Sequence, residues 1–243
     1  AIAQSCDVFF YDLAFNMGID QIHDSLSFFQ FGKKTGIDLP GELGGILPSR
    51  DWKKINKDEP WYRGETLITG IGQGFMTASP LQLALATAAI ANKGQLLVPQ
   101  VLMHSQSKNG DLFEDQNLKS KQIPIKDINN WELIIEAMKQ TVYGKFGTAK
   151  KLNNKLKYSL AGKTGTAQVF GLDPEEEYIA ENIEEKLRDH ALFTGFAPIE
   201  DPQVAIAIIV ENAGSGSSKA APLARELLDE YFIKNPVELN TLN

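Results

Sequence analysis

Cysteine, clustered basic residues and long apolar runs are all scarce in this sequence, and each scarcity excludes a class of protein. A single cysteine, Cys6, rules out a framework of internal disulfides. The net charge is −7 and no basic cluster stands out, which argues against nucleic-acid binding. No apolar run approaches the roughly 18–20 residues that span a bilayer, and no signal peptide is recognisable. The 243 residues, 43% of them hydrophobic, are enough to build one core.

Metal and nucleotide motifs are absent as well. The three histidines, His23, His104 and His190, are scattered and lack H-E-x-x-H spacing. The glycine-rich stretch 70–74 does not follow the G-x-G-x-x-G pattern, and no parallel β-α-β pattern surrounds it. The sequence therefore predicts no nucleotide site.

The most informative motif is Lys-Thr-Gly-Thr at residues 163–166, which follows an apolar lead-in and reads as part of a strand. The ammonium of Lys163 can stabilise negative charge on a substrate, and the hydroxyls of Thr164 and Thr166 can bind a carboxylate. Gly165 has no side chain, so an extended peptide can lie close to the strand. K-T-G is one signature of β-lactamases and penicillin-binding proteins.

A second K-T-G copy, Lys34-Thr35-Gly36, shows that the triplet alone is a weak signal. It follows a helical pattern and precedes Pro40. Gly36 is interpreted as a helix C-terminal residue and Pro40 as a stop signal, so this copy is assigned no catalytic role.

Ser5-Cys6-Asp7 opens the chain and leads into an apolar pattern with helical spacing. One interpretation is that Ser5 or Asp7 is a helix N-cap. The other is the S-x-N element of the same enzymes, here S-x-D, with Ser5 as a proton-relay hydroxyl and Asp7 orienting the substrate amide. The order S-x-N before K-T-G, with long helical sequence between, favours the second interpretation.

The nucleophile of such enzymes lies in a Ser-x-x-Lys motif that precedes S-x-N. The chain holds one such spacing, Ser105 to Lys108, in a polar stretch that carries an Asn109-Gly110 turn signal. It follows Ser5 instead of preceding it, so it is interpreted as a surface loop. We therefore expect a fragment, residues 1–243, of a transpeptidase domain that begins after its own nucleophile.

The periodicity predicts a mixed fold of helices and strands, α/β (α+β), with an antiparallel sheet between helices and a helical lobe that supplies Ser5. We expect a mainly helical lobe over 1–70 and a sheet-containing lobe over 71–243. In the first half, the patterns predict two helices in 7–33 broken at Gly18, mainly loops over 34–78, a helix over 79–94 capped by Ser79, and short strands over 95–123. In the second half, they predict a helix over 127–143, an acidic helical excursion over 173–190, and a helix over 217–235. Between the last two, a hairpin turns at 199–202 into a strand at 204–210 that is covered on both faces.

With these motifs in place, the sequence resembles the class B penicillin-binding proteins, and within them the elongation-specific penicillin-binding protein 2 group of Gram-negative bacteria. The resemblance covers nearly the whole chain and implies the penicillin-binding transpeptidase fold, which serine β-lactamases share. It is carried by SCDVFFYDLAFNMGID, TGIDLPGE, PWYRGETLITGIGQGFMTASPLQLALA, GTAK at 147–150, AGKTGTAQVFG and LRDHALFTGFAP followed by DPQVAIAIIVEN.

The resemblance implies a D,D-transpeptidase that cross-links peptidoglycan stem peptides during cell elongation and is a target of β-lactams. It implies catalytic roles for Ser5, Asp7, Lys163 and Thr166, with Thr164, Gly165 and Thr166 binding substrate. Asp7 departs from the Asn of many relatives, and an ionised carboxylate only accepts hydrogen bonds. Further implied are a SEDS-type glycan polymerase and rod-elongation proteins as partners, and the periplasmic face of the inner membrane, reached by an N-terminal anchor outside these residues.

No cofactor is required by this resemblance, but Cys6 is a candidate zinc ligand. Some relatives hold a zinc near this position, with the other ligands upstream and so outside this chain. A small buried thiol and a disulfide to an upstream segment are the alternatives. The resemblance also implies a structural hydrogen-bonding role for His190 near the strand of Lys163.

Three other functions remain open from the sequence. A β-lactamase would share the fold but needs a base that activates water, and no candidate is evident. A non-catalytic penicillin sensor would be acylated without transferring to an amine. These 243 residues alone would form an inert scaffold with half a site.

Overall fold

The computed structural model describes residues 1–102, 104–106, 112–114, 120–169 and 183–235. The chain forms two compact units: unit 1 holds Ala1–Asp7 with Asn129–Asn243, and unit 2 holds Val8–Ile128. This division differs from the expected boundary at 70/71. The segment of Ser5 belongs with the sheet because the turn before it packs against a helix of unit 1.

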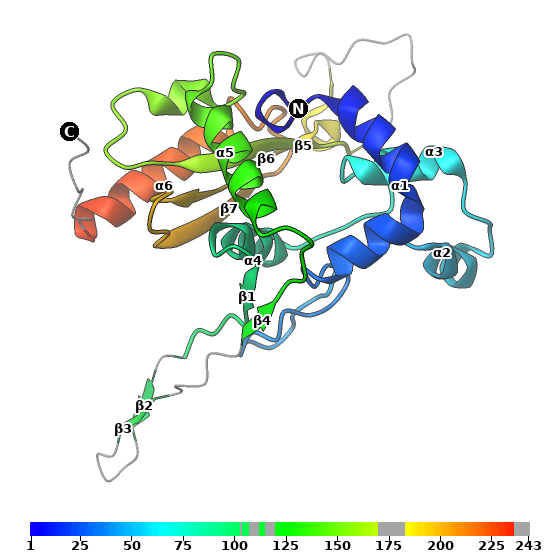
Figure 1. Ribbon diagram of the computed structural model, residues 1–243, viewed down its shortest axis with the longest axis horizontal. Coiled ribbons are helices and arrows are strands. Elements are labelled where there is room, and N and C mark those ends of the chain that lie inside the picture. The colour runs from blue at the N-terminus through cyan, green and yellow to red at the C-terminus, as the bar shows by residue number, and fades with distance from the viewer. Residues whose placement is uncertain (103, 107–111, 115–119, 170–182, 236–243) are drawn as a thin grey trace. The chain divides into compact units, whose positions relative to one another are not determined.

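The sheet of unit 1 is antiparallel, with strand order β5-β6-β7 (Figure 1). The strands are β5 (Ala161–Ala167), β6 (His190–Ala197) and β7 (Val204–Val210). In the register, Lys163 lies opposite Thr194, and Thr166 lies opposite Ala191. The predicted strand of Lys163 and the predicted hairpin after it are confirmed.

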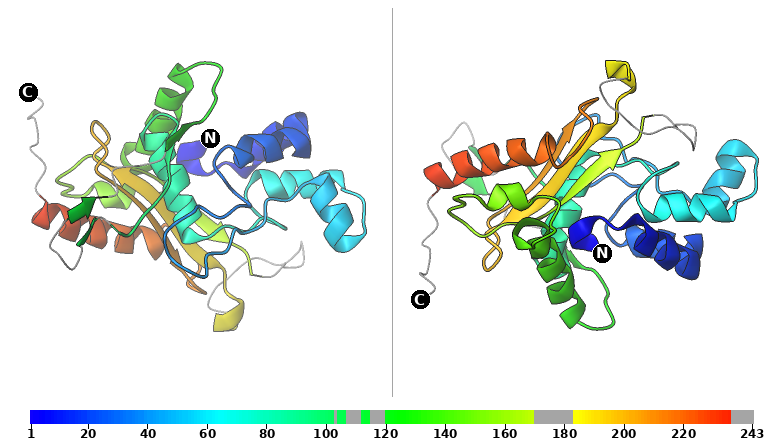
Figure 2. Two further views of the ribbon diagram at one scale, coloured as in Figure 1. Left: turned by 90° about the horizontal axis from the view of Figure 1, so that it is seen from below. Right: turned by 90° about the horizontal axis from the view of Figure 1, so that it is seen from above.

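Two helices, α5 (Asn129–Tyr143) and α6 (Ala220–Lys234), pack against this sheet. Unit 1 also holds the short 3-10 helices η1 (Ile2–Gln4), η2 (Lys150–Asn153) and η4 (Glu185–Leu187). α6 runs along β6 and β7, and η1 lies beside α5 (Figure 2). The alanines of α6 are fully buried, which lets the helix approach Phe193 of β6 closely. The predicted helices over 127–143 and 217–235 are thus confirmed, the second beginning three residues later.

Strand β7 corrects one expectation. All seven of its residues are partly exposed, so it is not covered on both faces. Val204, Ile206, Ile208 and Val210 pack against the core that α6 closes. The continuous apolar run misled the prediction because, among the described residues, β7 is the last strand in the order and has a neighbouring strand on one side only.

The acidic excursion predicted over 173–190 falls mostly outside the described residues. Of the described part, Glu185–Leu187 form a short 3-10 turn, and His190 already belongs to β6.

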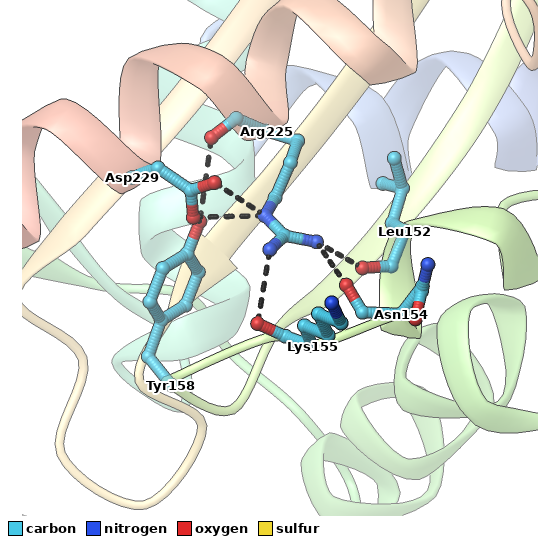
Figure 3. A network of polar contacts seen from close by, with 6 residues as sticks. All are labelled: Leu152, Asn154, Lys155, Tyr158, Arg225 and Asp229. Carbon is cyan, nitrogen blue, oxygen red and sulfur yellow. Dashed lines mark hydrogen bonds and ion pairs between the residues drawn. The ribbon is translucent and has the colours of Figure 1, made fainter.

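Arg225 of α6 is the centre of a polar network that fixes the loop before β5 (Figure 3). Its guanidinium donates to the carbonyls of Leu152, Asn154 and Lys155 and to the Asp229 carboxylate. Tyr158 donates to the same carboxylate at 2.8 Å. Burial, and next the hydrogen bond to Asp229, raise the pKa of Tyr158, so its hydroxyl stays protonated as the donor. The network therefore ties α6 to the chain that enters β5.

Unit 2 holds all of α1 (Asp7–Ser27) except its first residue, and the helical path is interrupted at Gly18, with φ 74° and ψ 160°. That break is the one predicted. α4 (Pro80–Ala91) has the expected Ser79 cap, and Gln82 completes it by accepting from the Ser79 N–H. The remaining elements are α2 (Arg50–Lys57), α3 (Arg63–Gly70), and the antiparallel pairs β1 (Gln95–Leu97) with β4 (Ser120–Gln122) and β2 (His104–Gln106) with β3 (Leu112–Glu114).

Helices α2 and α3 lie where the sequence predicted mainly loops. They are joined by Lys53, which is 1% exposed and forms ion pairs with Glu59 and Glu65. Its ammonium also lies 4.3 Å from the centre of the Tyr62 ring. A buried lysine breaks the apolar pattern on which the prediction depended. Among the described residues, no helix of either unit is long and apolar enough to cross a membrane.

We predict that Arg225→Ala destabilises the protein by about 2–4 kcal/mol, because three carbonyls and the Asp229 carboxylate lose their donor together. Urea unfolding followed by circular dichroism measures this. Lys234→Ala on the same helix is the matched control. It removes an exposed ion pair with Glu230, at 70% and 59% exposure, and should cost below about 0.5 kcal/mol. Equal losses would contradict the network's role.

Candidate active site

Lys163 and Ser5 meet in unit 1 although 158 positions separate them in the sequence. The Lys163 Nζ donates to the Ser5 Oγ at 2.5 Å and to the Thr164 carbonyl at 2.6 Å. The structure thus joins the S-x-D element to the K-T-G-T strand. Because the ammonium donates to the serine oxygen, the Ser5 hydroxyl keeps its own proton to donate elsewhere.

Ser5 is held in place by the backbone of the N-terminal turn. It ends η1 in the left-handed conformation, with φ 50°, and its N–H donates to the Ile2 carbonyl. The N–H of Cys6 returns to the Ala1 carbonyl at 3.1 Å. This tight turn, and not the N-cap role considered for Ser5, aims the serine at Lys163. A left-handed serine is uncommon, and such residues gather at functional sites.

Burial lowers the pKa of Lys163, because the charged form loses solvation, and the negative charge of Asp7 partly opposes this shift. Asp7, the first residue of α1, is exposed. The lysine is therefore easier to deprotonate than a solvated one. A cation that can also give up its proton suits a proton relay.

The substrate-binding residues proposed from sequence lie on β5 but differ in exposure. Thr164 is buried, with 7% of its surface exposed, and its hydroxyl lies 2.7 Å from the Thr148 hydroxyl. Thr166 is exposed and projects from the same strand face, two residues on. Thr164 thus already has one hydrogen-bond partner within the protein.

Gly165 lies under the loop that leads into α6. A Cβ built on Gly216 would be 2.2 Å from the carbonyl oxygens of Gly165 and Leu192, so only glycine fits there. This contact fixes the β5 backbone behind the K-T-G-T motif. Gly216 belongs to no recognised motif, although its place between two serines just before a helix was the available signal.

Cys6 is exposed and free, so it is not the buried thiol that was one alternative. Among the described residues, no group of three His, Cys, Asp or Glu side chains could hold a metal ion. Those residues alone therefore do not fit a zinc site, and Cys6 could contribute at most one ligand.

The second K-T-G copy lies in a loop well after α1 has ended at Ser27, so Gly36 is not the helix C-terminal residue that the sequence predicted. The Thr35 N–H and hydroxyl and the Gly36 N–H all donate to the Glu42 carboxylate, at 2.6, 2.5 and 3.1 Å. Its polar groups are therefore engaged within the protein. Ser105 lies in strand β2 opposite Phe113, not in a loop, and Lys108 lies outside the described residues.

His190 has the structural role that the resemblance implied. It starts β6 opposite Ala167, and its Nδ1 accepts from the Asn212 N–H at 3.0 Å. It therefore ties the chain leaving β7 to the strand beside β5.

Thr148 is the residue near Lys163 and Ser5 that the motif analysis missed. It lies between α5 and η2, and its N–H donates to the Ala3 carbonyl at 3.1 Å. The stretch GTAK that contains it counted toward the resemblance, but its place beside β5 follows only from the fold.

The chain belongs to the penicillin-binding protein transpeptidase domain family, which it matches over residues 1–229. It is 40% identical to the peptidoglycan D,D-transpeptidase MrdA of Haemophilus influenzae over 232 residues, covering 96% of this chain and 36% of that protein. The chain therefore spans about a third of the length of such relatives. The resemblance found in the sequence is thereby confirmed.

Solved structures agree with this assignment. Penicillin-binding protein 2 of Pseudomonas aeruginosa, in complex with WCK 5153, has a TM-score of 0.81 and 42% identity. The match covers 96% of this chain and 48% of that one. Penicillin-binding protein 2 of Helicobacter pylori, in complex with MreC, has a TM-score of 0.80 and 34% identity over 96% of this chain and 39% of that one. The expected transpeptidase fold is confirmed.

We predict that Asp7→Asn lowers the pKa of Lys163 further, because it removes the one charge that opposes the burial shift. A 1H–13C NMR titration of the lysine Cε signals measures it. Asp201→Asn, which removes an exposed carboxylate from the β6–β7 turn, is the control and should leave this signal unchanged.

The same shift has a signature in stability. The folded state releases the Lys163 proton at a lower pH than the unfolded state does, so between the two pKa values the unfolded state binds more protons. The free energy of unfolding contributed by Lys163 therefore rises with pH across that window.

The NMR titration of Asp7→Asn tests the electrostatic coupling between Asp7 and Lys163. A Lys163 signal that titrates as it does in the wild type would contradict that coupling.

Proposed function

We propose that the protein is a peptidoglycan D,D-transpeptidase that cross-links stem peptides during cell elongation. The observation that carries this proposal is the contact between Lys163 on the K-T-G-T strand and Ser5 of the S-x-D element. Family membership supports it, and the relative in Haemophilus influenzae carries the same activity in its name.

In the proposed mechanism, a serine upstream of Ser5 is the nucleophile. The oxygen of this serine attacks the carbonyl of the penultimate D-Ala, and an adjacent lysine takes the proton of the serine hydroxyl. The terminal D-Ala then leaves, and its amine accepts a proton. An amine of a second stem peptide then attacks the acyl-enzyme, forming the cross-link and releasing the serine. β-Lactams imitate the D-Ala-D-Ala end, so they should acylate the same serine.

The residues of this chain would bind and move protons around that serine. Ser5 relays a proton between the catalytic amine and the leaving group, and Lys163 donates to its oxygen. Asp7 orients the substrate amide as an acceptor. The Thr166 N–H contributes to the oxyanion hole, and the hydroxyls of Thr164 and Thr166 hold the terminal carboxylate. Gly165 lets the peptide lie along β5.

We also propose partner proteins and a cellular location for this chemistry. Relatives act on peptidoglycan, and the Helicobacter pylori protein binds MreC, so we propose rod-elongation proteins and a SEDS-type polymerase as partners. Peptidoglycan lies outside the inner membrane, so we place the protein on the periplasmic face, anchored by a segment outside these residues.

We predict that Lys163→Ala in the full-length protein slows acylation by a fluorescent penicillin at least about 100-fold, the scale of one lost electrostatic contact in the transition state. Lys34→Ala changes the other K-T-G copy, whose threonine and glycine bind Glu42, and should have almost no effect. Equal effects would show that the wrong copy was chosen.

The same assay separates the proposal from its rivals. A β-lactamase would turn the penicillin over, and a penicillin sensor would be labelled without accepting an amine. The 243 residues alone should give no adduct, since their one Ser-x-x-Lys begins at Ser105 in strand β2. Mass spectrometry that finds an adduct on Ser105 would contradict both assignments.

We also propose that Cys6 contributes one ligand to a zinc ion whose other ligands lie upstream. The exposure of its thiol supports this. We predict about one equivalent of zinc in the full-length protein, and a melting temperature lowered both by a chelator and by Cys6→Ser. Lys234→Ala, an exposed substitution that keeps the thiol, is the control. Metal-free protein with unchanged melting would exclude the site.

A further inference from the structure

Thr148 touches both halves of the site yet belongs to neither motif. Its backbone N–H donates to the Ala3 carbonyl, two residues before Ser5, and its hydroxyl lies 2.7 Å from that of Thr164. It therefore connects the turn that carries Ser5 with the strand that carries Lys163. We infer that Thr148 is a positioning residue that orients the Thr164 hydroxyl toward the carboxylate of the substrate. This inference rests on the proposed function.

The direction of the hydrogen bond between the two threonines decides what Thr164 can do. A hydroxyl has one proton to donate and can also accept. When Thr148 donates to Thr164, the Thr164 proton is left for a third group. A substrate carboxylate only accepts, so its arrival selects this direction. Two hydroxyls in series then end on the negative charge, where hydrogen bonds are strongest.

Thr148 is held firmly enough to act in this way. The next residue, Ala149, is buried and donates to the Thr141 carbonyl at 3.0 Å. The preceding Gly147 packs so closely that a Cβ there would lie 2.3 Å from the Thr141 carbonyl oxygen. Backbone contacts on both sides thus fix Thr148, and its own N–H stays bonded to Ala3 whatever side chain it carries. A group fixed in this way positions Thr164 at little entropic cost.

Thr148→Val tests the hydroxyl with nearly the same shape, and Thr148→Ser restores the hydroxyl. In the full-length protein, the second-order rate of acylation is measured with benzylpenicillin and with its methyl ester, which lacks the carboxylate. We expect Thr148→Val to slow benzylpenicillin about 10-fold, the scale of one hydrogen bond to a charged group, and the ester less than about 2-fold. Thr148→Ser should react with benzylpenicillin as wild type does.

The ester arm distinguishes positioning from misfolding. Equal losses with both compounds, or no loss with either, would overturn the inference. Loss with benzylpenicillin that Thr148→Ser fails to restore would do so as well. If the wild-type protein reacts with neither compound, the proposed function itself fails, which is a different result from an unreactive valine variant beside a reactive wild type.

A double-mutant cycle tests whether Thr148 acts through Thr164. If it does, Thr148→Val should add nothing to the loss already caused by Thr164→Val with benzylpenicillin. Losses that multiply would mean that Thr148 contacts the carboxylate directly, and the positioning role would be wrong.

Discussion

A lysine ammonium that is largely removed from water is the constraint on which the rest of unit 1 depends. Burial disfavours the charge of Lys163, so the charge persists only where oxygen atoms replace the lost water. The Ser5 hydroxyl and the Thr164 carbonyl supply them. Both come from backbone that is itself fixed, by the left-handed turn at Ser5 and by the strand pairing of β5. The chemistry of the proposed relay is therefore a consequence of how two backbone segments meet.

Three contacts within unit 1 keep the Ser5 turn and strand β5 in place. Arg225 ties α6 to the loop before β5, Gly216 packs against the back of Gly165, and Thr148 bonds the N-terminal turn to the same strand. Each contact comes from a different part of unit 1, and each limits one movement of β5 or of the Ser5 turn. A site assembled from such supports can hold its groups at fixed distances.

The sequence predicted the elements with strong local signals. Ser79 before an apolar run, Gly18 within a helical pattern and the turn at 199–202 all gave correct boundaries, because each acts through its own backbone. It failed where burial depends on distant residues. Lys53 is buried only because two glutamates and a tyrosine ring surround it, and β7 is partly exposed although every residue is apolar. The division into units and the role of Thr148 were invisible for the same reason.

The order of the chain through unit 1 has a consequence for synthesis. Ser5 is translated before Lys163, which follows only after all of Val8–Ile128, and these intervening residues form a separate unit. The turn that carries Ser5 therefore cannot contact β5 until the whole of the inserted unit has been synthesised. Closing a loop of that length carries an entropic cost that grows only slowly with size, so the insertion adds delay more than instability. During this interval the Ser5 segment has no strand to dock on, and its apolar neighbours are exposed to chaperones and proteases.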